Sequence, residues 1–293
     1  MATASSRGLG TPDTRARRRK GNGVPRRRRS RRWRTRLQSI RKKLNAAPAA
    51  ARAALITLAV AATFLAANLV YQIVRKPTEI FYPARHTFNK TPAETWRDYG
   101  DLFAEYSTAN ITPELLAALA QAEGAGNPVA HTYWRWRLSW HPFAVYEPAS
   151  SAVGMYQMTD AAFAEARHYC IRHHVVVEQG CWLTSMYTRV VPSHAIELAS
   201  VLLDRGVSTV LADHGASARQ KEDLAAVIHL CGAGPAKAFV RRGFRPGEGE
   251  KCGDHDVANY LTELDSLKQQ FLQLAVSGPT LSQPLKQAGW SGG

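Results

Sequence analysis

The spacing of hydrophobic positions divides the chain into contrasting segments. Residues 53–74 form an apolar run without a single charge. Beyond residue 91, apolar residues recur every three or four positions, which is the spacing of helices that bury one face. No alternating run is long enough for a sizeable sheet, and only the β-branched residues 175–177 favour a short strand. The pattern therefore predicts a mainly α protein.

Local signals indicate where the helices begin. Thr91-Pro92-Ala93-Glu94 has the capping-box pattern with Pro at the first helical position, and predicts a helix to about Tyr106. Thr112-Pro113-Glu114 opens a second helix, which the glycines after Glu123 end. Further helices are expected at 160–172, 193–205, 220–230 and 256–274.

The apolar run is long enough to cross a membrane. At a rise of about 1.5 Å per residue, 53–74 matches the hydrocarbon thickness of a bilayer. A cleaved signal peptide is the alternative, but its apolar region is usually about 7–15 residues and its basic region would be unusually long here. We therefore predict one transmembrane signal-anchor helix. Its distinctly polar residues are Thr57, Thr63, Asn68 and Gln72.

Positive charge is confined to the N-terminal side of this run. Residues 1–52 contain 18 Lys and Arg and one acid, whereas the rest contains 20 Lys and Arg and 22 acids. The positive-inside rule then predicts a single-pass protein of a bacterial inner membrane, with a cytoplasmic N-terminus and a periplasmic body. Residues 1–52 lack a core and are expected to be disordered. A nucleic-acid partner is not expected, because the membrane separates this basic tail from the body.

Four cysteines follow the apolar run. An even count in an oxidising compartment suggests two disulfides, and the short-loop pairings Cys170–Cys181 and Cys231–Cys252 are favoured over the other connectivities. A zinc site made from these cysteines and nearby histidines is the alternative, but the usual ligand spacings are absent. Those histidines are His168, His173 and His174. No cofactor or metal is expected.

One carboxylate interrupts the apolar face of the second helix. Glu123 follows Leu119 by four residues and shares its stripe. A buried carboxylate is costly unless it has a partner or a chemical role. Burial and the negative end of the helix dipole predict a raised pKa, as a general acid requires. The alternative is a glutamate that turns to solvent where the helix frays at Gly124.

Four motifs in order resemble those of the soluble-lytic-transglycosylase domains of the goose-lysozyme-like superfamily. Residues 123–128 resemble its Glu-Ser-x-x-x-Pro segment, and 150–159 resemble its Ser-x-x-Gly-x-x-Gly-Leu-Met-Gln-hydrophobic stretch. Residues 230–235 resemble its Tyr-Asn-Ala-Gly-Pro turn, and 259–261 lie where the family has a Tyr-Val pair. The resemblance covers about residues 100–270, and the order of the motifs makes it specific.

The resemblance implies a lysozyme-like α fold and cleavage of peptidoglycan. Glu123 would protonate the glycosidic oxygen between N-acetylmuramic acid and N-acetylglucosamine, and then act as base while the muramyl C6 hydroxyl closes a 1,6-anhydro ring. The substrate's N-acetyl group would assist, so that no second carboxylate is required. Tyr260 would hydrogen-bond near Glu123 and orient it. The implied substrate-binding residues are Ser151, Met155, Tyr156, Gln157 and Met158.

The sequence departs from the family at several of these positions. Gly124 replaces Ser, Tyr156 replaces Met, and Cys231-Gly232 replaces Tyr-Asn. The stretch after Glu123 is also longer and rich in aromatic residues. It is either a sugar-stacking wall or a hydrophobic cluster behind the cleft. The hydrophobic cluster is favoured for most of these residues, and we expect one or two of Tyr133, Trp134 and Tyr146 to face the substrate.

Two alternative functions are open. A goose-type lysozyme would hydrolyse the same bond, and needs a second carboxylate about 6.5–9.5 Å from the first, for which Asp160 and Glu147 are the candidates. We expect Asp160 instead to stabilise the first turn of a helix. A non-catalytic peptidoglycan-binding scaffold is the other alternative, because Gly124 removes a hydroxyl from the site.

The predicted organisation has five parts. A basic tail at 1–52 precedes the anchor at 53–74 and a connector at 75–90. The lysozyme-like domain follows at 91–276, and a loose tail ends the chain at 277–293. The short connector predicts cleavage of glycan strands close to the inner membrane, and by analogy a wall-spanning secretion or envelope complex is a possible partner.

Overall fold

The structure, a computed structural model, describes residues 46, 48–84, 86–212 and 214–277. The prediction of disorder for 1–52 falls almost wholly outside these residues, as does the loose tail predicted at 277–293. The chain divides into two compact units, 1–65 and 66–293, and the division lies inside the first long helix.

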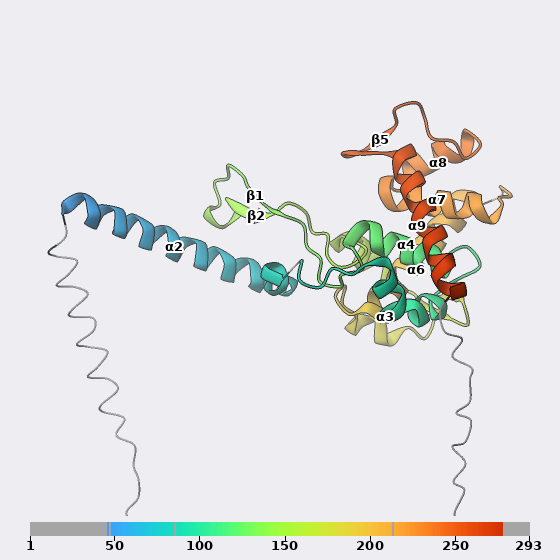
Figure 1. The fold of residues 1–293 in the computed structure, drawn as a ribbon, viewed down its shortest axis with the longest axis horizontal. Coiled ribbons are helices and arrows are strands. Elements are labelled where there is room, and N and C mark those ends of the chain that lie inside the picture. Colours follow the sequence, from blue (N-terminus) through green and yellow to red (C-terminus); the bar gives the residue numbers. More distant parts are fainter. Residues whose placement is uncertain (1–45, 47, 85, 213, 278–293) are drawn as a thin grey trace, which may run out of the picture. The chain divides into compact units, whose positions relative to one another are not determined.

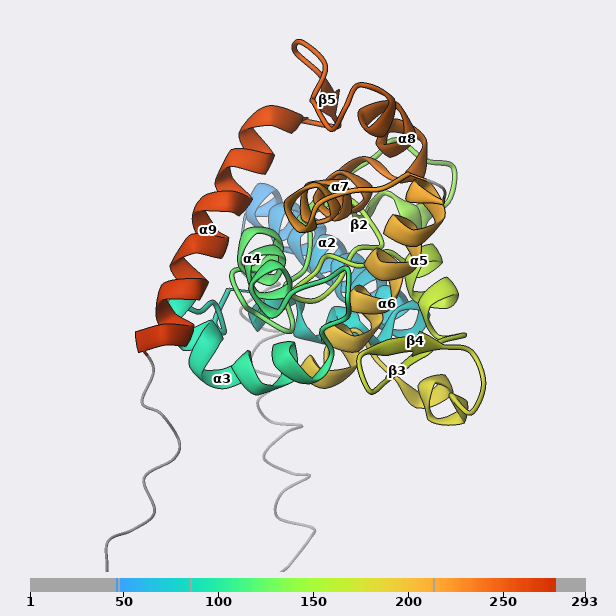
Figure 2. The same cartoon turned by 90° about the vertical axis from the view of Figure 1, so that its right-hand side faces the viewer.

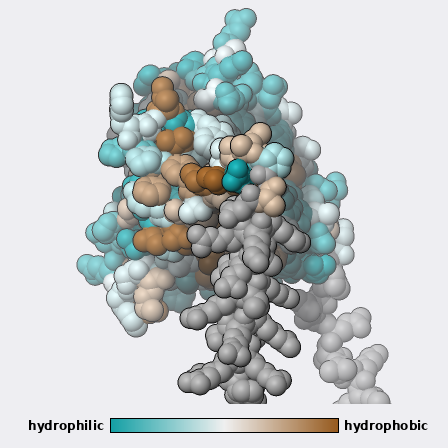
Figure 3. All heavy atoms as spheres, turned by 90° about the vertical axis from the view of Figure 1, so that its left-hand side faces the viewer, coloured by the Kyte–Doolittle hydropathy of each residue, from teal (hydrophilic) through white to brown (hydrophobic). Residues whose placement is uncertain are grey.

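That helix is α2, Ala49–Arg75, which begins four residues before the predicted anchor. It is long and apolar enough to cross a membrane, either as an anchor or as a signal. Large apolar side chains such as Leu58, Val60 and Val74 are exposed along it. On the face drawn in Figure 3, hydrophobic side chains gather near the middle, among hydrophilic ones. The exposure fits a helix whose surroundings are lipid.

The second unit is mainly helical, as predicted. Its principal helix is α4 (Pro113–Gly124), which packs against its neighbours α3, α6 and α9. Figure 2 shows α4 between α9 and α6, with α3 at one end and α7 and α8 at the other. The bounds of these helices are α3 Pro92–Glu105, α6 Pro192–Leu211, α7 Ala218–Cys231, α8 Ala233–Arg241 and α9 Val257–Ser277.

The sequence signals at the helix starts correspond to caps. The Thr91 hydroxyl accepts the Glu94 N–H while the Glu94 carboxylate accepts the Thr91 N–H, so the capping box of α3 is complete. The Thr112 hydroxyl caps α4 by accepting the Leu115 N–H. Residues 115–120 of α4 are all buried, which makes this helix the centre of the core.

The helix predicted at 160–172 is wrong in its second half. The helix there, α5, covers only Asp160–Ala166. Residues Cys170–Arg172 form strand β3, which pairs antiparallel with β4, Val175–Val177. The positive φ angles of His173 and His174 turn the chain between these strands, and the β-branched residues of β4 favour the extended partner. Helix α8 was not predicted.

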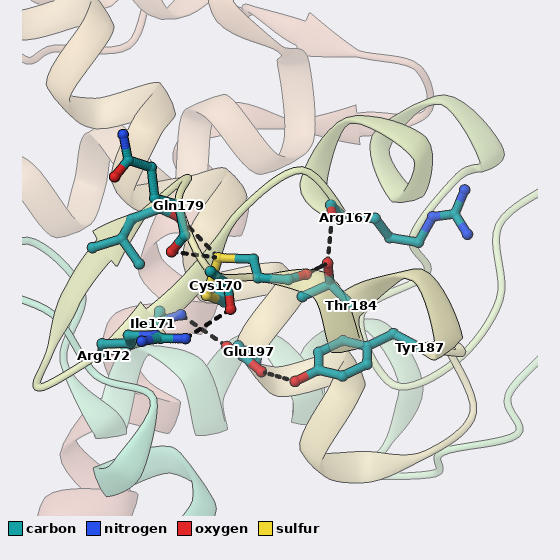
Figure 4. The surroundings of a disulfide bond; sticks show 11 residues. Arg167, Cys170, Ile171, Arg172, Gln179, Thr184, Tyr187 and Glu197 are labelled. Carbon is teal, nitrogen blue, oxygen red and sulfur yellow. Dashed lines mark hydrogen bonds between the residues drawn. A yellow bond between two sulfur atoms is a disulfide. The ribbon is translucent and has the colours of Figure 1, made fainter.

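Two disulfides connect the pairs that the short loops favour, Cys170–Cys181 and Cys231–Cys252. They suggest an extracytoplasmic location. Figure 4 shows the first of them, with the buried Glu197 carboxylate below it. Glu197 accepts hydrogen bonds from the Ile171 N–H at 2.8 Å and the Tyr187 hydroxyl at 2.7 Å. A carboxylate inside the core is therefore satisfied by one donor from the loop that the disulfide closes, Ile171, and by one donor beyond that loop, Tyr187.

The remaining regular structure is short. Strands β1 (Trp134–Trp136) and β2 (Tyr146–Pro148) pair antiparallel, and Figure 1 shows this hairpin as an arm apart from the helical body. Strands β5 (Lys251–Cys252) and β6 (His255–Asp256) form a third small pair. The described 3-10 helices are η1 Pro77–Ala84, η2 Pro142–Ala144 and η3 Trp182–Met186.

Candidate functional site

A cavity of about 500 Å³ opens beside the C-terminal end of α4. Its walls come from α5, α6 and the end of α7, and from the loop that precedes α5. Glu123, in the last turn of α4, is one of its lining residues, and the side chain is 21% exposed. Other polar or charged lining residues are Gln157, Thr159, Glu165, Arg205, Thr209 and His229. A volume of this size is typical of small-molecule sites.

Two side chains from other helices hold the Glu123 carboxylate. The Tyr260 hydroxyl, in the first turn of α9, donates to Glu123 Oε1 at 2.7 Å. His229 Nε2, in the last turn of α7, lies 3.5 Å from the same oxygen. The Cys231–Cys252 disulfide begins two residues after His229. Three segments distant in sequence therefore converge on one carboxylate.

The predicted raised pKa of Glu123 is wrong. Burial alone raises it, but the hydrogen bond and charge of His229, the hydrogen bond from Tyr260 and the charge of His255 lower the pKa by more. The pKa of Glu123 therefore lies below its ordinary value. Burial and the helix dipole follow from the local sequence, whereas His229 and His255 come near Glu123 only through the fold.

Burial and the neighbouring carboxylate raise the pKa of Tyr260. The hydroxyl therefore keeps its proton at neutral pH and donates it to the hydrogen bond with Glu123. A donor of fixed direction orients the carboxylate toward the cavity. Tyr260 is thus a positioning residue for Glu123.

The loop at residues 150–159 packs directly on the end of α4. A Cβ on Gly124 would lie 2.7 Å from the Met155 Cα, so the serine of the related motif does not fit here. Gly154, at a φ of +85°, is equally restricted, because a Cβ would lie 2.3 Å from the Arg189 carbonyl oxygen. Glycine at position 124 therefore has a structural reason: the backbone of this loop occupies the space that a Cβ would need.

The loop's predicted substrate residues have different surroundings. Met155 and Tyr156 are fully buried, and the Tyr156 hydroxyl donates to the Leu116 carbonyl oxygen at 3.1 Å. Tyr156, Gln157 and Met158 line the cavity, and the Gln157 amide donates to the Gly154 carbonyl oxygen at 2.9 Å. Ser151 lies elsewhere, where its hydroxyl accepts the N–H of Asp160.

The predicted aromatic contacts lie on the β1–β2 hairpin and its flanks. Trp134 is buried, and its indole N–H donates to Glu79 at 3.1 Å, while Tyr146 stacks on Trp136. Tyr133 is exposed. The described lining of the cavity includes none of the three. The structure therefore brings Gln157, Met158 and Tyr260 to Glu123, and leaves these aromatic residues on a separate arm.

The two acids considered for hydrolysis are engaged elsewhere. Asp160 lies in the first turn of α5, as expected, and pairs with Arg189 at 2.7 Å. Glu147 pairs with Arg137 at 3.4 Å. The described lining of the cavity contains neither, whereas Glu165 on α5 is part of it.

Sequence reasoning missed His229, His255 and Glu165. His229 directly precedes the 230–235 motif, whose first glycine is Gly232, and this position is the one signal that could have drawn attention to it. In the described part of the chain, no group of three or more His, Cys, Asp or Glu side chains is placed to hold a metal ion.

The cavity thus combines one oriented carboxylate, an adjacent histidine and a second acid with an apolar floor. Such a site can move a proton to or from a bound molecule. Comparison of the chain with protein-family models, curated proteins and solved structures gives no match.

Proposed function

We propose that this protein is a membrane-anchored lytic transglycosylase with a lysozyme-like domain, which cleaves the glycan strands of peptidoglycan in the periplasm. The observation that supports the proposal most strongly is the Glu123 carboxylate at the wall of the cavity, oriented by Tyr260. Three of the four sequence motifs support it further, since the segments at 123–128, 150–159 and 230–235 all contribute lining residues, and Tyr260 of the fourth bonds to Glu123.

In the proposed reaction Glu123 acts twice. Its protonated form donates to the glycosidic oxygen as the bond from that oxygen to the muramyl C1 breaks. The resulting carboxylate then takes the proton of the C6 hydroxyl as O6 bonds to C1, which closes the 1,6-anhydro ring. Glu123 ends protonated as it began, and no water is consumed. The N-acetyl group of the substrate stabilises the charge at C1 between the two steps.

The acid step requires Glu123 to be protonated, although the charged histidines favour its ionised form. Burial acts in the opposite direction and favours the protonated form, against the contributions of His229, Tyr260 and His255. A glycan that fills the cavity displaces water and strengthens the effect of burial.

The hydrolase alternative is retained because of one observation. Glu165 lines the same cavity and is exposed, so a second carboxylate is available to activate a water molecule. A lysozyme with Glu123 and Glu165 would leave a reducing end on its product.

The products distinguish the two functions. Full-length protein in detergent is incubated with purified peptidoglycan, and the soluble muropeptides are analysed by mass spectrometry. The proposal predicts muropeptides lighter by one water than those of a hydrolase. Reducing ends would support the lysozyme, and intact strands that co-sediment with the protein would support a non-catalytic scaffold.

A further inference from the structure

The β1–β2 hairpin exposes an unusual amount of apolar surface for a part of the chain outside α2. Trp136 is 66% exposed, and Leu138 and Trp140, between the two strands, are both 102% exposed. Single exposed apolar residues are ordinary, but a group on one arm indicates a surface that contacts something. A two-stranded hairpin has little core of its own to account for these residues.

The hairpin contacts the last two turns of α2 within the second unit. The Asn68 side-chain amide donates to the Tyr146 carbonyl oxygen, and the Gln72 amide donates to the Phe143 carbonyl oxygen, both at 2.8 Å. Tyr71 stacks on Phe143 with ring centroids 4.9 Å apart. Asn68 and Gln72 are buried, although they belong to an otherwise exposed apolar helix.

These hydrogen bonds satisfy polar groups of both α2 and the hairpin that would lie at the edge of a bilayer. An amide side chain on a membrane helix is costly unless it is bonded, and so is a carbonyl of irregular backbone. Asn68 and Gln72 are one turn apart and face the same side, where they bond the two hairpin carbonyls. Asn68 lies six residues before Val74, which is about 9 Å along a helix. The hairpin therefore reaches the depth of the last turns of α2.

The two faces of the hairpin differ in the way that an interfacial element requires. Trp134 and Trp136 both pack against Tyr146 on one face, with ring centroids 5.1 and 4.6 Å away. Arg135 and Arg137 alternate with them and are exposed. Aromatic residues with neighbouring arginines are typical of the boundary between headgroups and acyl chains.

A groove of about 490 Å³ lies where the end of α2 meets the hairpin. It is lined by Tyr71, Arg75, His141, Pro142, Phe143 and Ala144. An arginine at the rim of an apolar groove suits a phospholipid, which presents a phosphate beside hydrocarbon.

We propose that residues 131–148 form a membrane-docking arm, which inserts Trp136, Leu138 and Trp140 into the headgroup region of the leaflet in which α2 ends. Arg75 and Arg135 lie beside the lipid phosphates. The ligand is the phospholipid surface itself. The inference rests on α2 as the membrane anchor and does not depend on glycan cleavage.

The arm would fix the body close to the membrane. A single helix followed by a connector leaves a domain free to rotate, whereas a second contact with the same leaflet restricts it. The face that carries the cavity would then keep one orientation relative to the bilayer.

Fluorescence quenching by lipids tests the proposal. Full-length protein with Leu138→Cys is labelled at this thiol with a bimane, under conditions that preserve both disulfides. It is placed in vesicles of phosphatidylcholine and phosphatidylglycerol that contain nitroxide-labelled lipid. Val175→Cys is the matched control, because Val175 is also apolar and 59% exposed but lies on the β3–β4 hairpin. Val60→Cys reports insertion of α2 itself.

The label at position 138 is expected to be quenched severalfold more strongly than that at position 175. Equal quenching at the two positions, with strong quenching at position 60, would overturn the arm and leave the anchor intact. Absence of quenching at position 60 would overturn the anchor and the arm together. Protection of the position 138 label by added peptidoglycan, without quenching by lipid, would assign the surface to glycan and overturn the proposal.

Discussion

At the end of α4 a charged side chain lies among apolar neighbours, whereas on the β1–β2 hairpin apolar side chains lie in solvent. The first region supplies its own compensation: Tyr260 donates to Glu123 at 2.7 Å and His229 lies 3.5 Å away. The second does not, since Leu138 and Trp140 are fully exposed. A misplaced charge with internal partners indicates a site built for chemistry. A group of exposed apolar residues that the chain does not cover indicates a surface that binds a partner outside the chain.

Glu123→Gln has the largest expected effect on this comparison. Gln retains the shape of Glu and accepts from Tyr260, but it cannot transfer a proton. Loss of general acid–base catalysis costs about 10²–10⁴-fold in rate. We expect this loss in kcat/KM on peptidoglycan, with a thermal unfolding curve close to that of the wild type. A variant that cleaves at the wild-type rate would leave Glu123 a structural residue.

Removal of the second disulfide comes next. Cys231→Ser with Cys252→Ser frees the end of α7 from β5 and loosens the positions of His229 and Tyr260 together. The free energy of unfolding should fall by about 2–4 kcal/mol, as measured by urea denaturation, and activity should fall with it. The matched control is Cys170→Ser with Cys181→Ser. The disulfide that it removes closes a shorter loop, so its loss should lower the free energy of unfolding by less. Equal losses of activity in both pairs would contradict a local role for Cys231–Cys252.

Tyr260→Phe removes one hydrogen bond to a carboxylate. Such bonds contribute about 1.5–3 kcal/mol, which corresponds to about 10–100-fold in kcat/KM if orientation of Glu123 is the role of Tyr260. Tyr187→Phe is the control, because the Tyr187 hydroxyl donates to Glu197 at the same distance of 2.7 Å. Both variants should lose stability, but only Tyr260→Phe should lose activity in excess of that. Parallel losses in the two would make Tyr260 merely structural.

His229→Gln tests the electrostatics of the pair. The bonds and charges around Glu123 lower its pKa, so removal of the His229 charge raises it. The protonated acid then persists to higher pH, and the alkaline limb of the pH–kcat/KM profile should move upward. Because the pKa of Glu123 is lower in the folded protein, its ionised carboxylate stabilises the fold at any pH above the pKa of the unfolded chain. This contribution is lost as the pH falls through the folded pKa. The variant should therefore lose less stability on acidification, and an unchanged pH profile would exclude the coupling.

Substitutions on the hairpin should have the smallest effect on the free energy of unfolding. Leu138→Ser with Trp140→Ser should change the free energy of unfolding in detergent by less than about 0.5 kcal/mol, because exposed side chains contribute little. A large loss of stability would mean that these residues pack against the body. The contrast with Glu123 would then no longer hold.

The sequence predicted most of the helices and the place of Glu123 at the end of α4, because both depend on local patterns. The capping residues Thr91 and Thr112 and the burial of α4 follow from spacing alone. The Tyr260–Glu123 hydrogen bond is present as the family resemblance implied. The direction of the Glu123 pKa shift could not be predicted, because it depends on His229 and His255, which are distant in sequence.

The aromatic stretch after Glu123 shows a different limit. Its composition favours a role in contact or burial, and composition alone does not separate a cleft wall from an arm. The stretch forms an arm because strand 134–136 pairs with strand 146–148, and because Asn68 and Gln72 hydrogen-bond to this hairpin. The shortened α5 has a similar cause, since the β3–β4 pairing and the Cys170–Cys181 disulfide override local helix preference.

The central claim is that Glu123 acts as both acid and base without a second carboxylate. Digestion of peptidoglycan in water enriched in ¹⁸O tests it most directly, with the wild type beside Glu165→Gln. The account predicts 1,6-anhydro products free of ¹⁸O from both proteins. Products that carry one ¹⁸O from the wild type and disappear in Glu165→Gln would contradict it, and would establish a hydrolase that uses Glu123 and Glu165 together.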